Sequence, residues 1–139
     1  MKILLVEDSR AIRLENERAL LQAGYEVICA EDGQQAMQLV VERQPDLILL
    51  DLLLPKMSGL EVLEYLKSNP ATAQIPVVVL SALYEKNREK LVAAGAEDYL
   101  EKNSLMVNGQ NSLPQVLEDL ICRINRRRGI AFMSVPTSH

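Results

Sequence analysis

Two neighbouring acids, Glu7 and Asp8, directly follow a short apolar run near the beginning of the chain. Adjacent like charges at the end of a buried segment are unfavourable unless a cation or water compensates them. A divalent cation would explain this pair, and so would a solvated strand end without a function. Residues elsewhere in the chain have to distinguish between these two interpretations.

Other polar residues occupy the same kind of position. Asp51 ends the run LILLD, Ser81 ends VVVLS, and Lys102 follows DYLE. In open parallel sheets, ligands bind at the carboxyl ends of the strands. If these runs are parallel strands, three carboxylates, one hydroxyl and one amine meet at a single edge. One acid after a strand is usually an ordinary loop residue, but five polar groups at one edge indicate a site.

These residue types favour phosphoryl chemistry at a hard cation. Three carboxylates within a few ångströms repel by roughly a few kcal/mol per pair at an effective dielectric of about 20. Mg²⁺ relieves this repulsion and prefers oxygen ligands, with Mn²⁺ as the alternative ion. Zinc is disfavoured because the one histidine is the terminal His139. One carboxylate can then attack phosphorus, while Ser81 and Lys102 contact the phosphoryl oxygens.

The elements that must position these groups alternate between strands and helices. Apolar runs predict five strands, at Ile3–Val6, Val27–Ala30, Leu47–Leu50, Val77–Leu80 and, less clearly, Asp98–Leu100. The segments between them have the apolar spacing of helices, and a fifth helix follows around Val116–Ile124. This alternation predicts an α/β fold, a three-layer doubly wound (βα)5 sandwich whose parallel sheet is covered on both faces.

Helix ends and the domain boundary are also marked in the sequence. Gly95 is placed to end the fourth helix. The stretch Ser112–Gln115 is typical of a capping box with a proline in the first turn. Periodicity is lost after Arg128, so we expect residues 1–128 to form the domain and residues 129–139 a tail or linker.

Bulk composition restricts the class of protein. The chain has 139 residues, 48% of them hydrophobic, and a net charge of −4. This length suits one domain with its own core. The negative charge argues against direct nucleic-acid binding, and no apolar run approaches the roughly 18 residues of a membrane span. The beginning of the chain lacks the layout of a signal peptide, so we expect a cytoplasmic protein.

Cys29 and Cys122 lie far apart, each within an apolar periodic segment. We interpret both as reduced thiols in the core rather than as a disulfide or a metal-binding pair. This interpretation agrees with a cytoplasmic location.

Four motifs in a fixed order resemble one known family. LLVEDS, DLLLPKMSG, VVVLSA and GAEDYLEK follow one another along the chain. From Lys2 to about Arg128, the chain resembles the receiver domain of two-component response regulators, which is chemotaxis-Y-like and has a flavodoxin-like fold. The resemblance implies a five-stranded parallel sheet in the order 2-1-3-4-5.

The resemblance also implies roles for the acids and the lysine. Asp51 would be the phosphoacceptor, and Lys102 would bind the phosphate. Mg²⁺ would be held by Glu7, Asp8, Asp51 and the backbone carbonyl of Leu53, with Asp8 as the more direct ligand of the acidic pair. The phosphoryl donor would be a sensor histidine kinase or a His-phosphotransfer protein.

A switch is implied as well. Ser81 matches the hydroxyl that moves toward the phosphoryl group, and Tyr99 matches the aromatic residue that then turns inward. Pro55 and Gly59 match the loop after the phosphoacceptor. The face made by the fourth helix, fifth strand and fifth helix would change and be read by a downstream protein, an output domain or a second protomer. Such a domain is a phosphoprotein switch, which phosphorylates and dephosphorylates itself, rather than a turnover enzyme.

The chain departs from the family pattern after Lys102. Asn103 stands where the family usually has a proline, often in a cis peptide. Because a cis bond before a non-proline residue costs roughly 3–4 kcal/mol, we expect a trans bond. The segment Asn103–Asn111 is also longer than expected, and Asn108-Gly109 predicts a turn within it.

Three alternative functions share the same fold class. A pseudo-receiver, an interaction module not controlled by phosphorylation, is disfavoured by the intact acids, Ser81 and Lys102. A phosphatase with an aspartate nucleophile would carry an acid two residues later, where Leu53 stands. A flavin carrier would need a phosphate-binding loop after the first strand, where Glu7 and Asp8 would repel a phosphate.

Leu53 and Leu83 affect the expected lifetime of the phosphorylated form. They lie two residues after Asp51 and Ser81, positions that in this family flank the route of the attacking water. Neither side chain can orient a water, so we expect slow self-dephosphorylation. We predict that Leu53→Asn shortens the lifetime of the phosphoryl group, measured by intact mass after the donor is removed. Leu53→Val, which stays apolar, is the control, and equal lifetimes in all three proteins would contradict the prediction.

Overall fold

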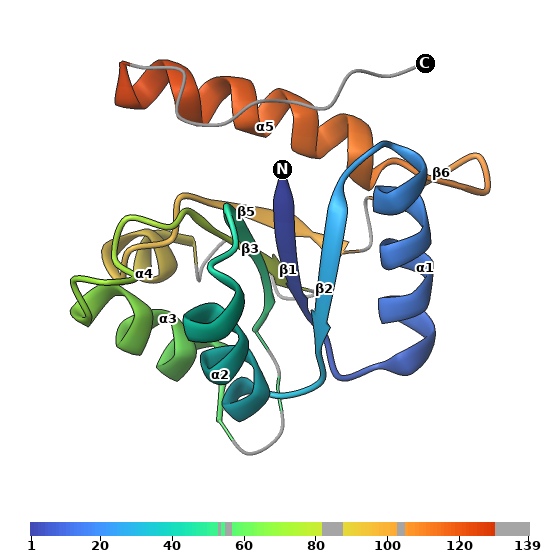
Figure 1. Ribbon diagram of the computed structural model, residues 1–139. Helices are drawn as coiled ribbons and strands as arrows, with labels where there is room; N and C mark the ends of the chain where they lie inside the picture. Colours follow the sequence, from blue (N-terminus) through green and yellow to red (C-terminus); the bar gives the residue numbers. More distant parts are fainter. Residues whose placement is uncertain (53, 55–56, 82–87, 103–104, 130–139) are drawn as a thin grey trace.

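The computed structural model describes residues 1–52, 54, 57–81, 88–102 and 105–129, and Figure 1 shows their arrangement. The strands are β1 Lys2–Val6, β2 Glu26–Ala30, β3 Leu47–Asp51, β4 Val77–Ser81, β5 Asp98–Glu101, β6 Met106–Val107 and β7 Gln110–Asn111. The helices are α1 Arg10–Gln22, α2 Gly33–Arg43, α3 Gly59–Ser68, α4 Arg88–Ala93 and α5 Leu113–Arg128.

Five of the strands form one parallel sheet in the order β2-β1-β3-β4-β5. This is the α/β doubly wound, flavodoxin-like fold that the sequence predicts, and both the fold class and the strand order are confirmed. In the register, Leu5 of β1 lies between Cys29 of β2 and Leu49 of β3. All strand ends that carry polar residues therefore meet at one edge.

Helices cover both faces of the sheet, which explains the uninterrupted apolar runs (Figure 1). Every residue of β3 and β4 is buried, and each buried Leu, Ile or Val contributes roughly 1.5–3 kcal/mol. One face packs against α1 and α5 through Leu20, Leu113, Leu117, Leu120, Ile121 and Ile124. The other packs against α2, α3 and α4 through Ala36, Val40, Val62, Leu63, Leu66 and Leu91.

Side-chain caps begin three of the helices, but the predicted cap of α5 is wrong. Ser9, Asp32 and Ser58 each accept a backbone N–H from the first turn of α1, α2 and α3, as residues of these types do at helix N-termini. Ser112 precedes α5 and makes no such bond. Its hydroxyl donates to the carbonyl of Leu105 at 2.5 Å instead.

The long segment after β5 folds into a two-stranded hairpin, β6–β7, before α5 begins. Asn108 (φ 52°) and Gly109 (φ 76°) form its turn in the left-handed conformation, which Asn and Gly tolerate best. The turn predicted at these residues is thus confirmed, while the two short strands are found only in the structure. Asn103 and its expected trans peptide bond lie outside the described residues.

Only one of the two cysteines fits the core interpretation. Cys29 is partly buried and Cys122 is exposed, and both are free. The apolar stripe of α5 includes Ile121 and Ile124, so Cys122 is left on the solvent side of that helix. Separately, no described helix combines the length and apolar character needed to cross a bilayer.

Gly59 permits a close approach between α3 and the end of β3. Its amide donates to the Leu52 carbonyl at 3.0 Å. A Cβ atom at this position would lie 2.5 Å from the carbonyl oxygen of Asp51 and 2.7 Å from the Cα of Leu52. The backbone on both sides would have to separate to admit any side chain.

We therefore predict that Gly59→Ala lowers the free energy of unfolding by about 1–3 kcal/mol, the usual cost of overpacking. Urea unfolding followed by circular dichroism measures this change. Gly109→Asn is the control, because nothing lies within 4 Å of its Cβ and Asn tolerates a positive φ. Equal stability of Gly59→Ala and wild type would contradict the close approach.

Candidate functional site

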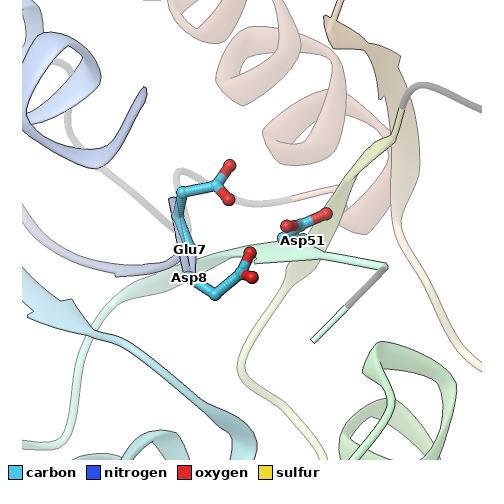
Figure 2. A group of neighbouring side chains, drawn as sticks. All are labelled: Glu7, Asp8 and Asp51. Atoms are coloured by element: carbon cyan, nitrogen blue, oxygen red, sulfur yellow. The ribbon is translucent and has the colours of Figure 1, made fainter. Parts of the chain in front are cut away.

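The polar residues predicted to share an edge of the sheet do lie at its carboxyl end. Glu7 and Asp8 follow β1, and Asp51 is the last residue of β3. One carboxylate oxygen from each lies within 4.8 Å of the other two, and Figure 2 shows the three side chains gathered from these strand ends. Glu7 and Asp51 are buried, whereas Asp8 is exposed. The cluster is thus open to solvent through Asp8.

Lys102 joins two of these acids. Its ammonium lies 2.6 Å from Oε1 of Glu7 and 3.2 Å from Oδ2 of Asp51. Burial alone would lower the pKa of Lys102, but the contacts with Glu7 and Asp51 outweigh it and raise that pKa. The lysine is therefore cationic, and it partly neutralises a site that carries three carboxylates.

Glu7 is the most strongly perturbed acid of the cluster. It is 1% exposed, and its Oε2 accepts the amide of Ser9 at 3.2 Å. Burial is the largest effect and raises the pKa of Glu7 to about 7; the bond from Lys102 lowers it and the neighbouring Asp51 raises it. Glu7 therefore changes charge near neutral pH in the metal-free protein.

Ser81 lies on β4, the strand next to Asp51, and Tyr99 lies on β5, one strand further along the sheet. Ser81 is the last residue of β4 and is buried. Its predecessor Leu80 is opposite Asp51 in the ladder, so the serine stands at the same edge as the acids. Tyr99 lies on β5 opposite Val79, and its hydroxyl oxygen is buried. Leu53, Leu83 and Pro55 lie outside the described residues.

Arg13 is a contributor that the sequence analysis missed. From α1 its Nη1 donates to the carbonyl of Glu7 at 2.9 Å and to that of Asp8 at 3.5 Å. Its Nη2 lies 3.3 Å from Oε1 of Glu31, just after β2. The guanidinium therefore fixes the turn that carries the acidic pair. Arg13 stands four residues after Ser9, the cap of α1, and so lies close to that turn. This spacing was the signal in the sequence that could have identified it.

The donor set fits a hard divalent cation. Glu7, Asp8 and Asp51 supply only oxygen atoms, which Mg²⁺ prefers. Their spacing allows one ion to contact more than one carboxylate, and the ion would offset the repulsion that Lys102 leaves uncompensated. Chemically, the site can hold a cation, neutralise an anion through Lys102 and present the carboxylate of Asp51 between them.

Comparison with known proteins decides the family. A model of the response regulator receiver domain matches residues 3–112. The chain belongs to this family of receiver domains. Receiver domains of response regulators are signalling domains of two-component systems and not typical turnover enzymes, so the coarse functional class is established as well.

Two curated relatives are longer than this chain, and the match covers only part of each. The phosphate regulon transcriptional regulatory protein PhoB of Pseudomonas aeruginosa is 45% identical over 101 residues, which is 72% of this chain and 44% of PhoB. The response regulator MprA of Mycobacterium leprae is 38% identical over 125 residues, or 89% of this chain and 49% of MprA. The receiver domain thus spans about half the length of these relatives.

Solved structures show the same fold. The receiver domain of the Francisella response regulator 1452 superposes with a TM-score of 0.75 at 25% identity, covering 92% of this chain and 98% of that one. Chemotaxis protein CheY4 of Vibrio cholerae gives 0.75 at 28% identity, with 86% and 97% covered. TrrA of Thermotoga maritima, solved with Mg²⁺ and BeF, gives 0.71 at 28% identity, with 86% and 97% covered.

The raised pKa of Glu7 predicts that Glu7→Gln stabilises the metal-free receiver domain in alkaline solution. Its pKa moves from 4.5 to about 7 on folding, so the folded state holds this proton more strongly than the unfolded chain does. The contribution of Glu7 to stability therefore falls as the pH rises from 4.5 to 7. Above that range, Glu7 lowers the free energy of unfolding by at most about 3 kcal/mol relative to its value at low pH. The neutral amide in Glu7→Gln avoids part of this loss.

Thermal unfolding in EDTA at several pH values between 4 and 8 measures this effect. The stability of Glu7→Gln relative to wild type should be lowest at pH 4 and rise toward pH 8. Glu64→Gln, an exposed position on α3, is the matched control and should show no such trend. A difference that stays constant with pH would contradict the raised pKa.

Proposed function

We propose that this receiver domain is a phosphorylation-dependent switch of a two-component or phosphorelay system, with Asp51 as the phosphoacceptor. The observation that carries the proposal is the ammonium of Lys102 lying 3.2 Å from Asp51 within a cluster of three acids. A carboxylate flanked by a fixed cation and a cation-binding pair is equipped to receive a phosphoryl group.

The residues divide this chemistry between them. Glu7, Asp8 and Asp51, together with the carbonyl of Leu53, would hold Mg²⁺ or Mn²⁺. When bound, such an ion neutralises phosphoryl oxygens and lowers the repulsion between an anionic donor and the acids. Lys102, whose ammonium lies 3.2 Å from Asp51, supplies a second positive charge to the phosphoryl oxygens.

Transfer forms one bond and breaks another. An oxygen of the Asp51 carboxylate attacks phosphorus in line, and the bond between phosphorus and the donor's histidine nitrogen breaks, its electron pair leaving with the nitrogen. The product is an acyl phosphate on Asp51. Hydrolysis by water later restores the carboxylate, slowed in this chain by the apolar residues Leu53 and Leu83.

The phosphorylated state is read at a distance from Asp51. Ser81 would bind a phosphoryl oxygen, and Tyr99 would repack beside it. The proposed output face is made by α4, β5 and α5; Tyr99 lies on β5 itself, and Ser81 lies on the neighbouring strand β4. The reader of this face is a downstream protein, an output domain or a second protomer. The donor is a sensor histidine kinase or a His-phosphotransfer protein, and the receiver domain acts in the cytoplasm. Residues 1–128 are proposed as the switching unit, with residues 129–139 as tail or linker.

The experiment is phosphorylation by acetyl phosphate with Mg²⁺, recorded by intact mass. We predict a phosphoryl adduct in wild type and none in Asp51→Asn. Glu64→Gln, at an exposed position of α3 outside the acidic cluster, is the control for a mild carboxylate-to-amide change and should be modified like wild type.

The result also decides between this function and the pseudo-receiver. An adduct that persists in Asp51→Asn would contradict the proposed acceptor. If no adduct forms, a titration with beryllofluoride and Mg²⁺, a mimic of the phosphoryl group, is followed by NMR. No Mg²⁺-dependent change in that titration would favour an interaction module that is not controlled by phosphorylation.

A further inference from the structure

Lys102 belongs to the candidate site but lies outside the strand pairing of the sheet. Lys102 stands one residue beyond the last pair of the β4–β5 ladder, which joins Ser81 to Glu101. In the described sheet, β5 is an edge strand with β4 as its neighbour. The ammonium nevertheless has to stay within reach of Glu7 and Asp51. Contacts other than the ladder must therefore position Lys102.

Backbone bonds connect Lys102 to the start of α5. The carbonyl of Lys102 accepts the amide of Leu105 at 3.3 Å. The carbonyl of Leu105 in turn accepts both the amide of Ser112, at 2.7 Å, and its hydroxyl, at 2.5 Å. Leu105 is 6% exposed and packs into the core shared by α1 and α5. The backbone of Lys102 is thereby tied to a buried anchor.

Ser112 makes this bond in place of the helix cap that its position predicts. Instead, Asn111 Oδ1 accepts the amide of Leu113 at 3.0 Å. A serine cap is typically worth about 1 kcal/mol to a helix. Because Ser112 directs its hydroxyl at Leu105 and not at α5, its local role is to hold Leu105, whose amide donates to the carbonyl of Lys102.

Asn111, at the end of β7, attaches the base of the hairpin to α1. Its Nδ2 donates to Oδ1 of Asn16 at 2.7 Å, and Asn16 is 7% exposed. Asn111 is partly buried, and the pair specifies one geometry because the buried amide of Asn16 would be costly without its partner. Asn16, Asn111 and Leu105 also line a pocket of about 310 Å³ together with Lys102. The base of the hairpin therefore lies directly beside the lysine.

We propose that Ser112 and Asn111 are positioning residues for Lys102. With Leu105 they form the hairpin stem, which fixes the backbone from which the ammonium reaches Asp51. This inference rests on the proposed function, in which Lys102 binds the transferred phosphoryl group. A displacement of about 1 Å at such a group can reduce a rate by up to about 10²-fold.

The first test removes the hydroxyl of Ser112 and then restores it. Phosphorylation of Asp51 by acetyl phosphate at saturating Mg²⁺ should be about fivefold slower in Ser112→Ala than in wild type, a partial loss of positioning. Ser112→Thr, which keeps a hydroxyl, should recover the wild-type rate. Gln110→Ala changes an exposed side chain on the same hairpin and is the matched control.

A second variant tests the attachment to α1. Asn111→Ser keeps an oxygen for the amide of Leu113 but is too short to reach Asn16, so it should slow phosphorylation to a similar degree. Thermal unfolding of each variant shows that the folded protein is being compared.

An NMR measurement reports on Lys102 without any phosphoryl transfer. In the metal-free protein, an ammonium held between two carboxylates should give a ¹⁵Nζ signal protected from exchange with water, assigned by its loss in Lys102→Arg. The signal should weaken in Ser112→Ala and Asn111→Ser and persist in Ser112→Thr and Gln110→Ala.

A wild-type rate and a wild-type lysine signal in both Ser112→Ala and Asn111→Ser would overturn the positioning role. An equal loss in Gln110→Ala would overturn it too, because the effect would then belong to the hairpin in general. If wild type accepts no phosphoryl group, the proposed function fails, and the lysine signal still decides whether the stem positions Lys102.

Discussion

The contact of one ammonium with two buried carboxylates is the constraint on which the site depends. Glu7 and Asp51 have almost no exposed surface, and two such acids without a cation would be strongly destabilising. Lys102 contacts both and so offsets the repulsion between two carboxyl groups that lie close together. Asp8, which is exposed, adds a third carboxyl group at the rim, where a divalent cation can enter from solvent.

The surrounding fold serves this contact by bringing together residues that are distant in sequence. A parallel sheet places the carboxyl ends of β1, β3 and β4 side by side, while Lys102 follows β5 at the same edge. Gly59 lets α3 begin directly against the carbonyl of Asp51. Arg13 secures the turn of the acidic pair from α1. Each of these residues restricts one strand end, so the charged groups meet with little freedom to separate.

Most of the fold could be predicted because its determinants are local. The runs Ile3–Val6, Leu47–Leu50 and Val77–Leu80 are apolar throughout, since helices bury both faces of the sheet. The alternation of strand runs with helical periodicity defines a doubly wound sheet. The meeting of Asp51 with Glu7 and Lys102 follows from that topology. The cap of α5 could not be predicted, because the partner of the Ser112 hydroxyl, Leu105, is reached only through the hairpin. Arg13 and the exposure of Cys122 also depend on packing that periodicity alone does not specify.

Two contacts of the site and the hairpin join residues that lie far apart in the sequence. Glu7 and Lys102 are 95 residues apart, and so are Asn16 and Asn111. Contacts of such long range form only after the loops between them have closed. A chain emerging from the ribosome therefore contains its acidic pair and its central aspartate well before it contains the lysine that balances them. The site is completed only once β5 and the hairpin have been synthesised, so an unfinished chain lacks the charge arrangement proposed for signalling.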